Sequence, residues 1–454
     1  MKYGYRVVYG GPDQLKKAGY EKVSHLPSIM DSRPGYHRLG SRFLIDRGLG
    51  LWDPHSRGTA VVPIPPSSVS MKSFADRLAN FLEWCDVRGL DPLLLDYTAD
   101  LIRHYQVEMQ KGIWSRDAEP LAASTINARM DVAAEYLTWS ADKGLREPFF
   151  IPKLTRHIKT GSATSAVGHL THEVQVRKGK IRQPKRRLGF PLENEIQDWL
   201  KRIYNKAGST RGLMCETILK TAVRREEASC WRLDTLPIER ADWDIPNLNA
   251  PYNDQAVLVL IIYGAKGKEY GRDHGDKIGP EGIIRVPLSL AEKLHEYRIK
   301  ERPKALAKWV KRGETLDEQR RLKNEAVHLF LDKETGRRIT GQSLYDTWRS
   351  VQRPRGWSPH LARDNWACSL VWQRMQEHRE LLEKALETKI DDSILQALQC
   401  NALTVIQTEI QPQLRHVSKE TTMIYLQWLA DRLGVNLHAT WEHEFEKEVK
   451  DEDE

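Results

Sequence analysis

The sequence lacks the features that mark several classes of protein. Its five cysteines are scattered along the chain without a Cys-x-x-Cys pair, which argues against a zinc site and against a disulfide framework. It contains no run of about 18 apolar residues that would predict a transmembrane helix. The N-terminus has no apolar core of a secretion signal. These absences predict a cytoplasmic protein with reduced cysteines and without a membrane partner.

Positive charge, in contrast, is in excess. The 454 residues carry a formal net charge of +8. Residues 442–454 contribute −6 to this value, with eight acidic side chains and two lysines, so the rest of the chain carries +14. A basic body of this kind attracts polyanions, and nucleic acid is the first candidate. A basic protein without a nucleic-acid ligand is the alternative that charge alone leaves open.

The N-terminal third divides into two parts. Residues 1–66 show little pattern beyond a short strand and turn near the start, and a cluster of prolines ends them. We interpret them as an extension of unknown role. Residues 67–150 repeat apolar side chains at helical spacing, as in Phe74, Leu78 and Phe81. They predict a bundle of about four short helices, which either contacts DNA or has no ligand.

Residues 151–190 form a strongly basic stretch. They contain ten lysines and arginines against one acidic residue, and few large apolar side chains. Such a segment builds no core but can lie along phosphates, so we interpret it as a DNA-contacting linker, with a solvated hinge as the alternative. Its candidate DNA-binding residues are Lys178, Lys180, Arg182, Lys185, Arg186 and Arg187.

The rest of the chain predicts a larger domain at 191–437 and an acidic tail at 438–454. Two strands, at 255–263 and 283–288, flank a turn rich in glycine. Helices account for most of the other residues. They are expected at 193–206, 211–229, 289–311, 342–351, 359–388 and 393–409. The larger domain is therefore expected to be mainly α with a small antiparallel sheet.

Three short motifs in this domain place basic side chains where a phosphate group can bind. Arg224 and Glu227 share a helix face, and the acid can hold the guanidinium in place. Lys266 lies in the glycine-rich turn between the two strands. His360 and Arg363 fall in the first turn of a helix that begins with Ser-Pro, where free N–H groups favour an anion.

A fourth motif ends the predicted domain. His416 precedes Tyr425 by nine residues, with a pair of threonines between them. Leucines then recur at helical spacing, so Tyr425 lies near the start of an amphipathic helix. Alone, this motif describes an ordinary helix with a half-buried tyrosine.

Taken in order, the four motifs resemble those of the tyrosine recombinase (phage integrase) family. The catalytic domain of that family reads T-G-L-R-x-x-E, then G-K-G on a hairpin, then H-x-L-R-H, then L-G-H-x-x-x-x-T-T-x-x-Y. The corresponding segments here are Thr221–Glu227, Gly264–Gly267, His360–Asp364 and Leu414–Tyr425. The helical residues 67–150 resemble the core-binding domain of the family, so the resemblance covers roughly residues 67–436.

The resemblance implies a fold and an activity. The fold is mainly α: a helical, SAM-like core-binding domain and a mixed α/β catalytic domain that form a C-shaped clamp. The activity is that of a site-specific DNA recombinase or integrase of a mobile element, acting through a 3′-phosphotyrosyl intermediate. Double-stranded DNA is the implied partner, bound by a dimer or tetramer. Accessory proteins of the same element are possible further partners. No metal, other cofactor or ATP is implied.

The resemblance also assigns roles to the matching residues. Tyr425 is the nucleophile that attacks phosphorus. Arg224 and Arg363 clamp the non-bridging oxygens, because a guanidinium offers paired donors and stays charged.

The other matching residues have assisting roles. His360 and His416 add hydrogen bonds, and His360 can help to take the tyrosine proton. Lys266 protonates the leaving 5′-oxygen. Glu227 and Asp364 support the neighbouring arginines.

Some positions depart from the family pattern. Asp364 stands where a histidine often follows the second arginine, and Ala222 and Arg415 replace glycines. The hairpin turn is longer than usual, so Lys268 or Arg272 is an alternative to the lysine assigned above.

The spacing between the last two motifs also departs from the pattern. The 52 residues between the second arginine and the second histidine exceed the usual spacing. The extra segment, near 373–410, is expected to be helical, and it is either a protein-contact element or a surface insertion without a role.

Two further activities remain open from the sequence. One is a DNA-binding regulator that keeps the fold without strand exchange. The other is a type IB topoisomerase-like relaxing enzyme, which shares the chemistry. The acidic tail is either exchanged between protomers or serves only solubility.

Overall fold

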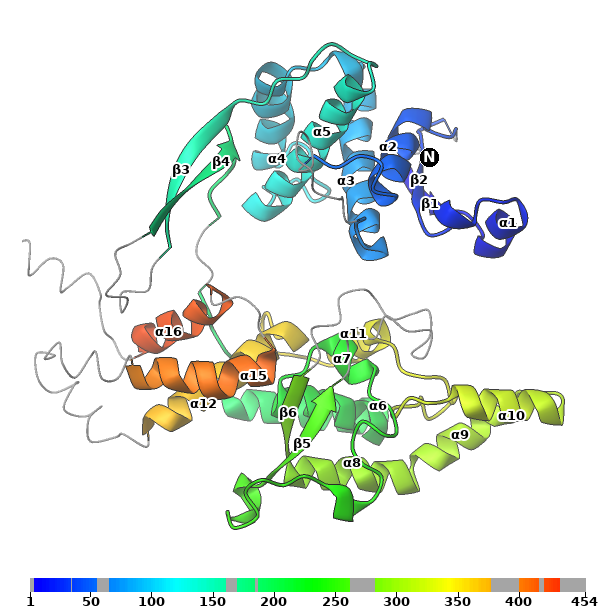
Figure 1. Cartoon of the computed structure of the whole chain (residues 1–454), viewed down its shortest axis with the longest axis vertical. Helices are drawn as coiled ribbons and strands as arrows, with labels where there is room; N and C mark the ends of the chain where they lie inside the picture. The colour runs from blue at the N-terminus through cyan, green and yellow to red at the C-terminus, as the bar shows by residue number, and fades with distance from the viewer. Residues whose placement is uncertain are drawn as a thin grey trace, which may run out of the picture. The chain divides into compact units, whose positions relative to one another are not determined.

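A computed structural model describes residues 4–33, 35–54, 65–160, 170–183, 187–261, 282–376, 400–415 and 420–432. The chain divides into two compact units, Met1–Lys185 and Arg186–Glu454. In the described residues, helices predominate and three two-stranded antiparallel sheets accompany them (Figure 1). This confirms the predicted mainly α fold with a small antiparallel sheet. The clamp arrangement of the two units stays a prediction.

Residues 4–33 and 35–54 contribute apolar side chains to the core of unit 1. Strand β1 (Arg6–Tyr9) pairs with β2 (Pro27–Met30), with α1 (Pro12–Lys17) and the 3₁₀ turn η1 (Glu21–Val23) between them, and α2 (Arg38–Gly48) follows. Fully buried Ile29, Phe43 and Leu44 belong to the same hydrophobic cluster as the later helices. Apolar side chains from the segment before residue 66 thus pack together with those of the helical bundle.

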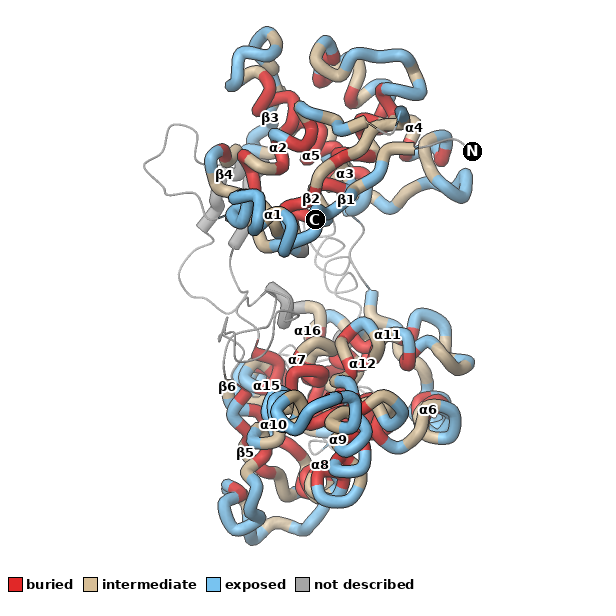
Figure 2. Tube along the Cα trace, turned by 90° about the vertical axis from the view of Figure 1, so that its right-hand side faces the viewer, coloured by how far each residue is buried: buried red, intermediate tan, exposed pale blue. Residues whose placement is uncertain are grey.

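The helical bundle predicted at 67–150 is present. Its elements are α3 (Ser68–Val87), the 3₁₀ turn η2 (Pro92–Leu94), the π-helix η3 (Tyr97–Gln106), α4 (Val107–Gln110) and α5 (Ala123–Asp142). Gly89 and Gly144 follow α3 and α5 with positive φ angles of 64° and 69°, which glycine adopts without strain. Figure 2 shows the buried segments of these helices in red.

The basic stretch 151–190 is not the extended linker that its composition predicts. Strand β3 (Lys153–Thr160) pairs with β4 (Leu170–Arg177) in an antiparallel hairpin. Pairing of the two strands satisfies their backbone hydrogen bonds, so the high charge does not prevent the hairpin. The segment after β4 is bound to the bundle: the Tyr97 hydroxyl donates to the carbonyl of Lys178 (2.8 Å), and the Asn127 amide donates to that of Ile181 (2.8 Å).

Unit 2 contains most of the elements expected in 191–437. Its elements are α6 (Glu193–Thr221), α7 (Arg225–Ser229), η4 (Arg240–Asp242), η5 (Tyr252–Asp254), β5 (Ala256–Ile261), β6 (Gly282–Pro287), α8 (Leu288–Lys300), α9 (Arg302–Val310), α10 (Leu316–Glu325), α11 (Gly341–Arg349), α12 (Pro359–Gln376), η7 (Ile406–Ile410), α15 (Gln411–Leu414) and α16 (Glu420–Arg432). Strand β5 pairs with β6 in an antiparallel arrangement, as expected.

Two expected helices are interrupted. The helix expected at 211–229 ends at Thr221, because Ala222 adopts a left-handed conformation (φ 54°), and α7 starts three residues later. The helix expected at 289–311 is divided into α8 and α9, with a proline at the start of α9. In addition, α10 is present where no helix was predicted.

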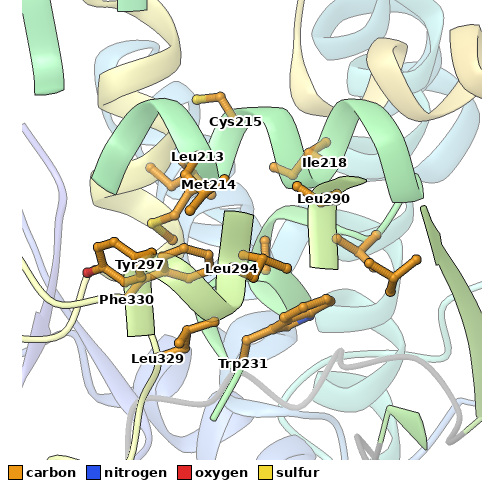
Figure 3. Packing of buried hydrophobic residues seen from close by; sticks show 14 of the residues in the cluster. Leu213, Met214, Cys215, Ile218, Trp231, Leu290, Leu294, Tyr297, Leu329 and Phe330 are labelled. Atoms are coloured by element: carbon orange, nitrogen blue, oxygen red, sulfur yellow. The ribbon is translucent and has the colours of Figure 1, made fainter. Parts of the chain in front are cut away.

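Two hydrophobic clusters lie among the described residues of unit 2. The larger one joins α6, the β5–β6 sheet and α8, and Figure 3 shows part of it, with Leu213 and Met214 facing Leu294 and Tyr297. The smaller cluster joins α12, the helical residues 400–414 and α16. The described end of the segment near 373–410 is thus part of the core. Among the described helices, none combines the length and the apolar character that crossing a bilayer requires.

Candidate active site

The end of α6 and the start of α7 fix one arginine and one acid. Arg224 is the N-cap residue of α7, and its backbone N–H donates to Oε2 of Glu227 (2.6 Å). Its Nη1 donates to Oε1 of the same carboxylate (2.7 Å). The Glu227 side chain is fully buried, whereas that of Arg224 is 33% exposed. The acid therefore anchors a guanidinium that still reaches the surface.

The second arginine, Arg363 on α12, joins two helix ends. Its Nη1 donates to the carbonyl of Ala222 and its Nη2 to the carbonyl of Leu414. These carbonyls lie at the ends of α6 and α15, where the helix dipole favours a cation. Burial lowers the pKa of Arg363 to about 10, and the nearby charge of Arg224 adds to this effect. The two arginines of the sequence motifs are thus neighbours.

Tyr425, the predicted nucleophile, is fully buried on α16. Its ring belongs to the smaller hydrophobic cluster of unit 2, and its hydroxyl donates to Oδ1 of Asp364 (3.2 Å). Burial, followed by the negative charge of Asp364, raises the pKa of the phenol, while the charge of Arg363 acts in the opposite direction. Tyr425 is therefore protonated near neutral pH and lies within the field of the second arginine.

His360 lies at the edge of this group. Its Nε2 is 3.9 Å from Oδ2 of Asp364, and its side chain is 73% exposed. The Asp364 carboxylate is buried. One of its oxygens faces the histidine at the surface, and the other accepts the hydrogen bond from the buried phenol.

Arg415 is an addition that the sequence motifs did not predict. It follows α15 with a positive φ angle of 49°. The resembled family has glycine at this position, and glycine adopts such an angle without strain. Its Nη2 lies 2.5 Å from Oε1 of Glu227, and its side chain is 3% exposed. In the sequence, an arginine in place of the motif glycine marked this position as unusual. It did not indicate that the side chain points toward Glu227.

Gln413 connects the segments that carry these residues. Its side-chain amide donates to the carbonyl of Thr221 (2.8 Å) and to that of Arg285 (3.0 Å). Its Oε1 accepts a hydrogen bond from the backbone N–H of Arg285 (2.7 Å). The ends of α6 and α15 are thereby fixed to strand β6. No sequence pattern identified this residue.

The structure brings together most of the described site residues. Arg224, Glu227, Arg363, Asp364 and Tyr425 form one group, with the exposed His360 at its margin.

Other predicted residues cannot be placed in this group. His416, Lys266, Lys268, Arg272, Lys185 and Arg186 lie outside the described residues. The exposed side chains of Lys178, Lys180 and Arg182 belong to unit 1, and that of Arg187 belongs to unit 2. Within the part of the chain that the structure describes, no cluster of three or more His, Cys, Asp or Glu side chains is suited to hold a metal ion.

Comparisons with known proteins add little to this geometry. No family model matches the chain, and no curated protein matches it. Among solved structures, the chain is similar to XerA recombinase, with a TM-score of 0.27 and 12% identity over 90% of this chain and 98% of that chain. At this level of identity and superposition, the likeness establishes neither a family nor an activity.

Proposed function

We propose that the chain is a DNA strand-exchange enzyme, a site-specific recombinase or integrase of a mobile element. The observation that carries this proposal is the meeting of a tyrosine phenol, two buried carboxylates and several arginines from separate segments of unit 2. Their order in the sequence matches that of the motifs described above. The partner is double-stranded DNA, bound by a dimer or tetramer of this chain. Accessory proteins of the same element are possible further partners.

The reaction is a transesterification at a DNA phosphodiester. The Tyr425 oxygen forms a bond to phosphorus, and the bond to the 5′-oxygen breaks, which leaves a 3′-phosphotyrosine and a 5′-hydroxyl. The new ester retains the energy of the old one, so the strand is rejoined without ATP. Arg224 and Arg363 stabilise the negative charge that grows on the non-bridging oxygens. In this scheme His416 adds a hydrogen bond to these oxygens, and Lys266 protonates the leaving oxygen.

Asp364 accepts the phenol proton during the attack. A phenol with a raised pKa stays protonated at neutral pH and needs an acceptor as it attacks. The carboxylate already accepts a hydrogen bond from that hydroxyl, and His360 lies beside its other oxygen. The position where the family often has histidine therefore holds a residue that is suited to the same task.

The burial of the nucleophile requires a conformational step before chemistry. Tyr425 is fully buried and Arg363 is 3% exposed, so neither can touch a DNA phosphate in this conformation. We expect DNA binding to shift the packing of α16 on α12, so that the phenol reaches the phosphate while it stays beside Asp364.

The basic segment after β4 is the proposed DNA contact of unit 1. Its backbone is fixed to the bundle through hydrogen bonds from Tyr97 and Asn127, while Lys178, Lys180 and Arg182 are exposed. Fixed cations of this kind can contact successive phosphates with little loss of conformational entropy.

The test uses a DNA duplex with a nick that lets a short strand diffuse away after cleavage. The full chain should form a covalent adduct that survives a denaturing gel, and Tyr425→Phe should form none. Binding of intact DNA should be unchanged in this variant, because the lost hydroxyl is buried. An adduct that persists in Tyr425→Phe would refute the role of this residue.

A DNA-binding regulator without strand exchange is the second candidate. The complete burial of Tyr425 is the observation that favours it, since a protein that only binds DNA does not need an accessible phenol. The same experiment separates the two: specific DNA binding by the wild-type chain without any adduct supports the regulator.

A further inference from the structure

Arg415 occupies a backbone position that an arginine adopts only at a cost. Its φ angle of 49° lies in the left-handed region, where a side chain crowds its own backbone and glycine does not. The stem of this arginine packs on β6, since a Cβ atom at Gly282 would lie 2.9 Å from its Cδ. A strained position that persists in a buried site requires an interaction that offsets the strain.

The offsetting interaction is the ion pair with Glu227. Oε1 of this carboxylate lies 2.5 Å from Nη2 of Arg415 and 2.7 Å from Nη1 of Arg224. Glu227 is fully buried, and a buried carboxylate is stable only when charged partners surround it. Burial alone would raise the pKa of Glu227, but the charges of Arg415 and then Arg224 outweigh burial and hold it below its usual value.

The second arginine changes the charge of the site. Glu227 with Arg224 alone is a neutral pair, whereas Glu227 with both arginines has a net charge of +1. The like charges of Arg224 and Arg415 both lower the pKa of Arg363, which places all three guanidinium groups within one field. A phosphoryl transition state gains negative charge, so the additional cation favours it over the ground state.

We propose that Arg415 is a positioning residue of the active site, which holds Glu227 together with Arg224 and keeps this group positively charged. The inference rests on the proposed function for its effect on chemistry, but the contact itself exists without DNA. Arg224 is then free to turn its exposed guanidinium toward the phosphate while its acid partner is held from a second segment.

The first experiment measures the rate of adduct formation at saturating nicked DNA. Arg415→Gly should slow this rate about 10- to 100-fold, because one buried ion pair of the site is lost. The dissociation constant for DNA should stay within about twofold, since Arg415 is buried and acts through Glu227 rather than on the ligand. Arg415→Lys should restore part of the rate, because its ammonium group can pair with Glu227 but lacks the planar fork.

A double-mutant cycle tests whether Arg415 acts through Glu227. If it does, Arg415→Gly/Glu227→Gln should be no slower than Glu227→Gln alone, because the first change removes a contact that the second has already weakened. A wild-type rate in Arg415→Gly, or losses that multiply in the double variant, would overturn the proposal.

A second experiment is done without DNA. It therefore tests the role of Arg415 even if the wild-type chain forms no adduct and the proposed function fails. Among the described residues, the charged groups that face Glu227 are Arg224, Arg415 and Arg363. Because the folded pKa of Glu227 is lowered, its stabilising effect is present at neutral pH and is lost as the pH falls through that folded pKa.

Arg415→Gly should therefore melt below the wild type at pH 7, and this difference should shrink or reverse in acid. A melting difference that is the same at every pH would show that Arg415 only fills space, and it would overturn the proposal.

Discussion

At the scale of single residues, the contact between Tyr425 and Asp364 has the clearest chemical meaning. The phenol donates to a buried carboxylate that replaces a histidine of the resembled family. A carboxylate has two opposed effects here. Its negative charge raises the pKa of the phenol and disfavours the nucleophilic form, but a carboxylate oxygen can accept the proton as the phenol oxygen attacks.

Asp364→Asn separates these two effects. The amide keeps the shape and the hydrogen bond but cannot accept a proton, so adduct formation at pH 7 should fall about 100-fold or more. Its rate should then rise with pH up to the most alkaline condition tested, because only the deprotonated phenol can attack. Rates measured from pH 6 to pH 10 check this.

The matched control for this variant is Asp431→Asn, the same change on the exposed face of α16, which should leave the profile unaltered. If Asp364→Asn is as fast as the wild type or faster, the carboxylate only raises the pKa of Tyr425 and is not the proton acceptor.

The motifs predicted some site residues and missed others for physical reasons. Arg224 with Glu227 and Arg363 were recognisable because short local spacing places each in a helix start. The Tyr425–Asp364 contact depends on how α16 packs on α12, and no local pattern contains that register. Arg415 was missed because a left-handed residue points its side chain in a direction that helical periodicity does not describe.

At the scale of elements, apolar periodicity predicted the long helices well. It located α3, α5 and the kinked α6, whose buried faces repeat at helical spacing. It failed at the β3–β4 hairpin, whose sequence is mainly polar and charged. It also failed at the break between α6 and α7, because Ala222 is a helix-forming residue that tertiary contacts hold in a left-handed conformation.

The segment that follows β4 yields a prediction about DNA binding. Replacing Lys178, Lys180 and Arg182 together with glutamine should reduce the slope of log affinity against log salt by about 2 to 3, since each lost phosphate contact removes close to one released counterion. Affinity for unrelated DNA should fall in parallel. Titrations between low and moderate salt measure both quantities.

The control for this triple variant lies in unit 2. Lys300, Lys304 and Arg320 are equally exposed cations, each paired with an acid of its own helix or turn. Their replacement by glutamine should leave the salt slope unchanged. An equal loss in both variants would mean that overall charge, and not this segment, determines the binding.

At the scale of the whole molecule, each unit has its own hydrophobic core. The division falls between Lys185 and Arg186, near the end of the predicted basic stretch. The first predicted domain starts at residue 67, whereas described residues before it also contribute to the core of unit 1. Their apolar side chains come from short strands, short helices and turns rather than from a long periodic segment.

The two cores predict that the units fold separately. Fragments 1–185 and 186–454 should each give a cooperative melting transition by circular dichroism, because each retains its complete core. The sum of the two transitions should resemble that of the full chain. A fragment that is soluble only together with the other would contradict this independence.

The hydrogen bonds of Arg363 have a consequence for genetics. The guanidinium that is proposed to bind the phosphate also donates hydrogen bonds to the ends of α6 and α15. These ends lie fifty or more residues away in the sequence, one before and one after Arg363. A screen for inactive alleles will therefore recover this codon for two separate reasons, loss of chemistry and loss of architecture. A dead clone at this site says little until its protein has been shown to accumulate and to resist proteolysis like the parent.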